Sequence, residues 1–174
     1  MKQFIVPAAV LMILFLVNTS FYYKPHTQTG YTVLIDKSDY ELSVYDNAGW
    51  LVTYPVVFGN KDLGDKLMEG DRKTPEGTFT LIGKRVHEKW SRFLMLNYPT
   101  AESYAKFNQR KAQGIIPASA KIGGAIGIHG VWPHEDYTID QYQNWTQGCI
   151  SMKNEDVKEL FSMLPVGTRV TIRR

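Results

Sequence analysis

Alternating apolar and polar residues dominate the chain beyond a short polar stretch, and this period of two predicts β-strands. Residues 31–36 are rich in β-branched side chains, and the apolar positions of residues 41–46 share one face. An Asp-Asn-Ala-Gly turn then leads into the apolar residues 50–58, in which Pro55 is typical of an edge strand or a bulge. These three segments predict a β-meander.

Three further strands are expected later in the chain, at residues 78–82, 126–129 and 168–172. The second contains only apolar residues before its final histidine, so we expect it to be buried. Polar stretches punctuated by glycine predict loops at residues 59–70 and 131–145.

Near the C-terminus the pattern changes from strand to helix. Apolar residues recur at the spacing of one helix face between Val157 and Leu164, with Asn154 as a favourable N-cap and Pro165 as a stop. Residues 100–113 contain few β-branched residues and indicate a second, partly helical segment. The predicted fold class is mainly β, a meander or sandwich-like arrangement with one or two helices packed on it.

The first 23 residues predict an export segment. Lys2 precedes the uncharged apolar residues 4–17, which have the length of the apolar core of a signal peptide. Extended to residue 23, the uncharged run reaches about 20 residues, enough to cross a bilayer. A cleaved signal peptide and an uncleaved membrane anchor both fit, and the lack of an Ala-x-Ala site favours the anchor. We expect a linker at residues 24–30 and one domain outside the cytoplasm at residues 31–174.

Composition narrows the functional classes only slightly. The chain has 174 residues, of which 44% are hydrophobic and 21% charged, as is ordinary for a single globular domain. Its formal net charge is +3, and no basic run with interleaved aromatic residues occurs. The composition therefore does not indicate a partner that is a nucleic acid.

The strongest chemical signal is the only cysteine of the chain, Cys149, which ends the tetrapeptide Thr-Gln-Gly-Cys. His129 precedes it at a distance that two neighbouring strands and a connecting loop can bridge. A thiol needs a base to become nucleophilic near neutral pH, and imidazole is the usual one. A lone cysteine is more often a buried apolar residue, but the flanking glycines, the lack of a disulfide partner and the exported context favour a nucleophile. The pattern predicts a cysteine acyl-transfer enzyme.

These motifs resemble the L,D-transpeptidase catalytic domain of the YkuD type, a family of cell-wall enzymes. In that family a histidine followed by glycine or serine precedes a Ser/Thr-x-Gly-Cys turn and an apolar residue. Here His129-Gly130 and residues 146–150 match that pattern. A second landmark, a Thr-Pro-x-Gly turn after basic residues, matches residues 72–77. The resemblance covers residues 31–174, so that segment is expected to be the catalytic domain.

Two positions depart from the commoner family pattern. Gln147 stands where histidine is frequent, and Ser151 stands where arginine or asparagine is frequent. With residues 149–156 and 96–99, these departures resemble the YafK-like murein L,D-transpeptidase branch, in which cleavage of peptidoglycan occurs beside transpeptidation. The resemblance therefore leaves open whether an amine or water is the acceptor.

The resemblance implies a mechanism and a set of site residues. Cys149 would attack the carbonyl between the diamino residue and the D-Ala of a peptidoglycan stem tetrapeptide, while His129 takes and returns the proton. The backbone carbonyl of Gly130 would orient the imidazole. No metal or organic cofactor is implied.

Four further residues are implied for substrate binding and for the oxyanion. The N–H groups of Gly148 and Cys149 would face the oxyanion, and Thr146 and Gln147 belong to the same turn. Arg72 is assigned from its residue type alone, and two interpretations fit it: bidentate pairing with a stem-peptide carboxylate, or an ordinary surface charge.

Other readings of the chain give different expectations. Sortases also place histidine before cysteine, but they show a longer interval and a Thr-Leu-x-Thr-Cys strand, whereas papain-like enzymes place the cysteine first. A peptidoglycan amidase or hydrolase with the same cysteine and histidine fits the sequence, as does an inactive wall-binding module. For a transferase, the expected partners are peptidoglycan stem peptides, a wall-attached protein as a further acceptor, and the membrane through an uncleaved residues 1–23.

Overall fold

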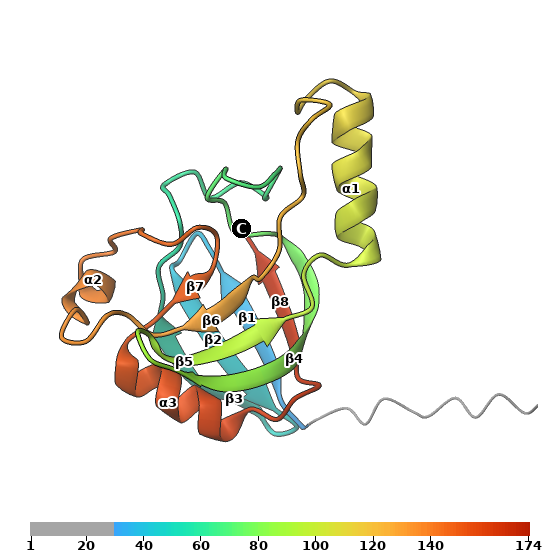
Figure 1. The fold of residues 1–174 in the computed structure, drawn as a ribbon. Coiled ribbons are helices and arrows are strands. Elements are labelled where there is room, and N and C mark those ends of the chain that lie inside the picture. The colour runs from blue at the N-terminus through green and yellow to red at the C-terminus, as the bar shows by residue number, and fades with distance from the viewer. Residues whose placement is uncertain (1–29) are drawn as a thin grey trace, which may run out of the picture.

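The computed structural model describes residues 30–174, so the predicted export segment lies outside the described residues. The described part is a mainly β domain with few helices, as predicted (Figure 1). Its strands are β1 (Thr32–Asp36), β2 (Glu41–Asp46), β3 (Gly49–Pro55), β4 (Gly77–His87), β5 (Ser91–Leu96), β6 (Gly127–His129), β7 (Ile150–Ser151) and β8 (Arg169–Arg173). Its helices are α1 (Ala101–Ala112), α2 (Tyr137–Asp140) and α3 (Asn154–Met163).

The strands form one curved sheet in the order β3-β2-β1-β8-β4-β5-β6-β7. The predicted meander is confirmed, because β2 pairs antiparallel with both β1 and β3. The last strand, β8, lies parallel to β1 and antiparallel to β4. An antiparallel bridge between Val57 and Ser151 joins the chain beyond β3 to β7. The two ends of the sheet therefore meet, and the sheet closes around the core.

Strand β4 is longer than the predicted residues 78–82, because its two halves serve different partners. Its first half pairs with β8 and its second half pairs with β5, with a register shift between Leu81 and Gly83. Such a bulge bends a strand and allows it to turn from one layer to the next. Strand β5 was not predicted, since consecutive residues Phe93 and Leu94 are both buried and the period of two is lost.

Helix α3 packs on β5 and β6 beneath the sheet, with Val157 and Leu160 buried (Figure 1). The prediction that Asn154 is the N-cap was wrong. Lys153 holds that position without a capping side chain, and the backbone N–H of Asn154 instead donates to Oδ1 of Asp136 at 2.8 Å. A carboxylate from the preceding loop therefore satisfies the positive end of the helix.

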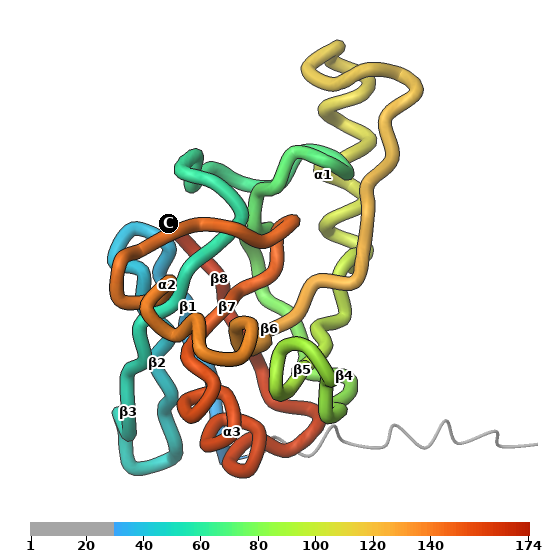
Figure 2. Tube along the Cα trace, turned by 60° about the vertical axis from the view of Figure 1, so that its left-hand side comes forward, coloured from blue at the N-terminus to red at the C-terminus, as the bar shows by residue number. Residues whose placement is uncertain are grey.

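Helix α1 confirms the predicted helical segment but does not pack on the sheet. It projects from the body of the domain, and the chain returns beside it (Figures 1 and 2). Phe107 is its only buried side chain, and Arg110 holds it to the preceding loop by donating to Oδ2 of Asp65 at 2.6 Å and to the carbonyl of Lys66 at 2.7 Å. Within residues 30–174, none of the helices has the length and apolar character needed to cross a membrane.

Candidate active site

Strands β6 and β7 bring the cysteine and the histidine together. The two strands are parallel, with Ile128 opposite Ile150 and His129 opposite Ser151. Continuing this register places Cys149 opposite Gly127, and residues 127 and 129 point to the same face of a strand. The side chains of Cys149 and His129 therefore emerge on one face of neighbouring strands.

The His129 side chain is buried, and its hydrogen bonding fixes its tautomer. Nδ1 lies 2.7 Å from the carbonyl oxygen of Gly130. A carbonyl oxygen only accepts, so Nδ1 carries the proton and Nε2 holds a free electron pair. Burial lowers the pKa of His129 to about 4, although the hydrogen bond to Gly130 opposes the shift. The imidazole is therefore neutral near pH 7.

The carbonyl that orients the imidazole is itself held in place. The hydroxyl of Ser151, which is fully buried, donates to the Gly130 oxygen at 3.2 Å. A Cβ atom at position 130 would lie 2.3 Å from Oδ1 of Asn154 and 2.9 Å from the carbonyl oxygen of Trp90, so only glycine fits. Sequence reasoning noted Ser151 only as a departure from the family pattern. Its place in the apolar strand after the cysteine was the available signal for a structural role.

Three aromatic rings surround the imidazole of His129. Trp90 stacks with it at a centroid distance of 4.7 Å and an interplanar angle of 27°. Phe93, its cross-strand partner on β5, lies nearly parallel to it at 6.0 Å. Trp145 meets it edge-on at 5.4 Å. Sequence reasoning placed Trp145 at the end of a predicted loop and did not identify Trp90 or Phe93 as neighbours of the histidine.

The Cys149 thiol is half-buried and protonated at rest. Its Sγ donates to the carbonyl of Ala125 at 3.5 Å. Burial raises the pKa of Cys149, while the backbone N–H of Gly127 and the charge of Lys66 act against the rise. A neutral thiol and a neutral imidazole therefore emerge on the same face of neighbouring strands.

The turn that carries the cysteine is closed by the Thr146 side chain. Its hydroxyl donates to the carbonyl of Cys149 at 2.7 Å and accepts from the N–H of Gly148 at 3.2 Å. Gly148 has φ of +124°, and a Cβ there would lie 2.7 Å from the carbonyl oxygen of Lys73. Glycine is thus required here by backbone strain and by the approach of a neighbouring segment. Gln147, in contrast, is exposed.

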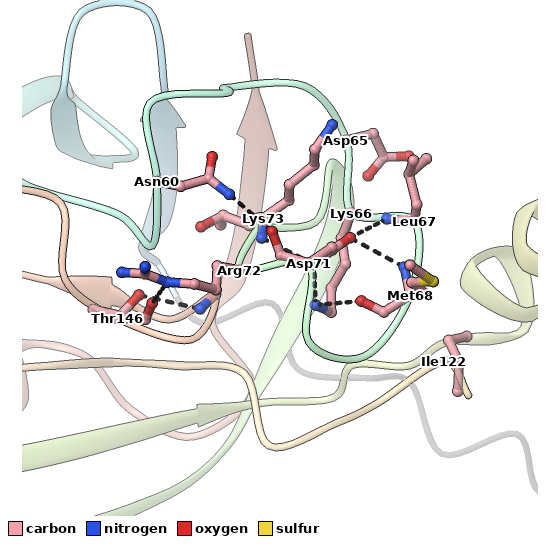
Figure 3. A network of polar contacts seen from close by, with 12 residues as sticks. Asn60, Asp65, Lys66, Leu67, Met68, Asp71, Arg72, Lys73, Ile122 and Thr146 are labelled. Atoms are coloured by element: carbon pink, nitrogen blue, oxygen red, sulfur yellow. Dashed lines mark hydrogen bonds and ion pairs between the residues drawn. The ribbon is translucent and has the colours of Figure 1, made fainter. Parts of the chain in front are cut away.

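Arg72 contacts this turn from the opposite side. Its Nε donates to the carbonyl of Thr146 at 3.3 Å, and the residue itself has φ of +58° (Figure 3). The carbonyl of Arg72 approaches Gly59 so closely that a Cβ there would lie 2.0 Å away. The predicted substrate-binding arginine is therefore also a structural support of the cysteine turn.

The neighbouring carboxylate of Asp71 organises the loop that bears Arg72 (Figure 3). It accepts from Nζ of Lys66 at 2.7 Å and from the backbone N–H groups of Leu67, Met68 and Lys73 at 2.6, 3.0 and 2.9 Å. Burial alone would raise the pKa of Asp71, but these donors outweigh it and the pKa is lowered. The sequence predicted this segment as a tight turn and did not reveal that one side chain orders it.

Two open clefts flank the cysteine turn, with volumes of about 300 Å³ and 490 Å³. The smaller cleft is lined by Lys66, Glu69, Gly70, Gly123, Gly124 and Gln147. The larger is lined by Gly59, Asn60, Lys61, Arg72 and residues 141–144. Among residues 30–174, no three His, Cys, Asp or Glu side chains are grouped so that they would hold a metal ion.

The fold and the site define a class of domain, a closed β sheet with a thiol and a neutral imidazole on the same face of two neighbouring strands. The chain belongs to the L,D-transpeptidase catalytic domain family, YkuD, which it matches over residues 30–172. It is 29% identical over 158 residues to the Escherichia coli protein named "Probable L,D-transpeptidase YcfS", across 80% of this chain and 43% of the relative.

Two solved structures share the fold. Bd1075 from Bdellovibrio bacteriovorus has a TM-score of 0.60 at 22% identity, over 86% of this chain and 50% of that one. The helical cell shape determining protein Pgp2 from Campylobacter jejuni has a TM-score of 0.59 at 24% identity, over 85% of this chain and 49% of that one. The chain thus spans about half the length of these two proteins, and less than half of YcfS.

Proposed function

We propose that this chain is an exported cysteine acyl transferase that acts on peptidoglycan stem tetrapeptides, at the bond between the diamino residue and D-Ala. The observation that carries the proposal is the free electron pair on Nε2 of His129, on the same face of neighbouring strands as the Cys149 thiol, in a member of the L,D-transpeptidase catalytic domain family. Membership indicates the reaction class, and the thiol and imidazole supply its chemistry.

The reaction runs in two halves. The thiol proton moves to Nε2 of His129 as Sγ of Cys149 bonds to the carbonyl carbon, and the C–N bond then breaks as D-Ala leaves with that proton. An acceptor amine next gives a proton to Nε2 and bonds to the thioester carbon, and the C–S bond breaks. The returning proton restores the thiol.

The turn geometry selects between the two predicted oxyanion donors. The N–H of Gly148 already donates to the Thr146 hydroxyl, so it becomes available only if that bond opens. The N–H of Cys149 is the better donor, because it belongs to the attacking residue and lies next to the developing charge. The expected contribution of one such donor is about 3 kcal/mol in the transition state.

The larger cleft suits a carboxylate of the stem peptide. It is lined by two cations, Arg72 and Lys61, and by the amide side chains of Asn60, Gln143 and Asn144, without a carboxylate. Nε of Arg72 is engaged by the turn, which leaves the other guanidinium N–H groups to bind an anion. Arg72 would thus connect substrate binding to the position of the cysteine.

The proposal also covers the location of the domain and the identity of the acceptor. The domain acts in the periplasm or on the outer face of the cytoplasmic membrane, with residues 1–23 as a signal peptide or anchor. The acceptor is an amine of a second stem peptide or of a wall-attached protein, and a hydrolase that uses water at the same thioester is the alternative. The thiol of Cys149 is only half-buried, and an open cleft is lined by Gln147 of the same turn, which supports access by either acceptor.

The test is intact-protein mass spectrometry of the full chain in detergent with purified tetrapeptide muropeptides. We expect a thioester adduct that forms with release of D-Ala on the wild type and is absent from Cys149→Ala and His129→Asn. His134→Asn is the matched control, since His134 is an exposed histidine, and it should form the adduct. Folded wild-type protein with a free thiol but no adduct and no turnover would refute the proposal. The soluble products distinguish transfer from hydrolysis.

A further inference from the structure

The hairpin between β4 and β5 places an indole ring directly on the histidine of the site. Trp90 lies at its tip and contacts His129 at a centroid distance of 4.7 Å. The same indole stacks with His87 at 4.4 Å and 7°, and it meets the edges of Trp132 and Trp145 at 6.3 and 6.0 Å. Trp90 is therefore at the centre of the aromatic cluster, between the catalytic strand and the outer hairpin.

The backbone of Trp90 has a separate contact, which makes its side chain testable. Its carbonyl accepts from the N–H of Gly130 at 3.0 Å and therefore helps to hold the strand that carries His129. A substitution at position 90 removes the ring but leaves this carbonyl in place. The contribution of the indole can thus be separated from that of the hairpin.

We infer that Trp90 is a positioning residue for His129, whose indole face fixes the plane of the imidazole and excludes water from it, so that the ring stays neutral and able to accept the proton of Cys149. This inference rests on the proposed function. The indole lies over the imidazole at an interplanar angle of 27°, so the two rings restrict one another's planes and the apolar face covers the imidazole. The stack therefore favours the neutral, proton-accepting form of His129 in a fixed orientation.

The exclusion of water has a measurable consequence. Burial is the main cause of the low pKa of His129, and Trp90 supplies part of that burial. Without the indole, water reaches the imidazole, and the pKa of His129 should rise from about 4 toward its ordinary value of 6.5. At pH 5 this would lower the neutral fraction of the imidazole by up to roughly 30-fold, whereas at pH 8 it would not change it.

Other charged and polar groups near the imidazole of His129 also influence its pKa. His87 on the same hairpin disfavours a charge on His129, and the cations Arg85 and Lys89 lie over the neighbouring rings of Phe93 and Trp132. The thiol of Cys149 emerges on the same face from the adjacent strand. From α3 and β7, the neutral side chains of Asn154 and Ser151 lie against the adjoining Gly130. None of these groups is removed by a change at position 90.

The experiment compares Trp90→Ala and Trp90→Phe with the wild type, in the full chain. Trp50→Ala is the matched control, because Trp50 is 63% exposed and lies on β3. Histidine-labelled protein gives the His129 titration by NMR, with the resonance assigned from its loss in His129→Asn. Single-turnover acylation by a tetrapeptide muropeptide is followed in parallel from pH 4.5 to 8.5.

In Trp90→Ala we expect the pKa of His129 to rise by at least about one unit and the acid limb of acylation to move with it. The maximal acylation rate should fall at least tenfold, with an unchanged half-saturating substrate concentration. Trp90→Phe should shift both profiles in the same direction by less, so the test does not depend on Trp90→Ala folding. A folded variant whose titration and acid limb match those of the wild type would overturn the inference. If the wild type forms no acyl-enzyme, the proposed function fails, while the titration still decides the role of Trp90.

Discussion

The buried neutral imidazole of His129 predicts a specific dependence of stability on pH. Its pKa is about 4 in the folded protein and near 6.5 in an unfolded chain. Between these values the unfolded state binds more protons, so unfolding is favoured as the pH falls. The stabilisation is fully present above pH 6.5 and is lost as the pH decreases through 4.

The size of the effect follows from the two pKa values. A shift of this size corresponds to about 3 kcal/mol of stability when the histidine is fully titrated. Between pH 7.5 and pH 5 the wild type should lose about 2 kcal/mol from this residue alone. Other groups titrate over the same range, including His87, whose pKa is also lowered by burial and by Arg85. Because His129→Asn retains these other groups, their contribution cancels when its stability is subtracted from that of the wild type.

The assay is urea denaturation of wild type and His129→Asn at half-unit steps from pH 4.5 to 8, followed by tryptophan fluorescence. The asparagine variant is expected to be less stable at neutral pH, because the hydrogen bond to Gly130 is disturbed. The difference between the two proteins should then shrink by about 2 kcal/mol on going from pH 7.5 to pH 5. Parallel curves for the two proteins over this range would refute the assignment of a buried neutral histidine.

Three other substitutions test the supports of the site, each by denaturation and by acylation of Cys149. Gly148→Ala should cost about 2–4 kcal/mol, because a Cβ would lie 2.7 Å from a carbonyl oxygen at a φ of +124°; a stability equal to wild type would contradict this strain. Ser151→Ala should cost about 1 kcal/mol and slow acylation, since it removes a donor to the Gly130 carbonyl; unchanged acylation would show that the carbonyl needs no support. Asp71→Asn should cost about 3 kcal/mol by leaving a buried lysine without its counter-ion, whereas Asp62→Asn, which breaks the pair between an exposed carboxylate and Lys73, should cost clearly less. Equal costs for these two aspartates would argue against the buried network.

The parts of the fold that the sequence predicted are those with a local pattern. The meander, the buried strand before His129 and helix α3 follow from alternation or helical spacing within a few residues. Strand β5 was missed because Phe93 and Leu94 are buried on both of its faces, so alternation disappears. The projecting course of helix α1 depends on Arg110 and a loop about forty-five residues earlier, which no local pattern encodes.

The candidate site also contains residues that the sequence identified and residues that it did not. Cys149 and His129 were found because thiol and imidazole chemistry marks them by residue type. The residues that support them were not found from the sequence, because the buried hydroxyl of Ser151 and the indole of Trp90 make their contacts across the sheet. For Gly148 the sequence suggested only an oxyanion role for its N–H, whereas the structure adds close packing against the backbone of Lys73.

The long-range pairing of the cysteine turn has a consequence for the order in which the enzyme is assembled. The turn is held by the carbonyl of Phe58 and by Arg72, and the sheet itself needs β8, the last strand, beside β1. Contacts so distant in sequence form late in folding. The placement of Cys149 and His129 on one face is therefore a property of the folded domain, and it is absent from an extended chain.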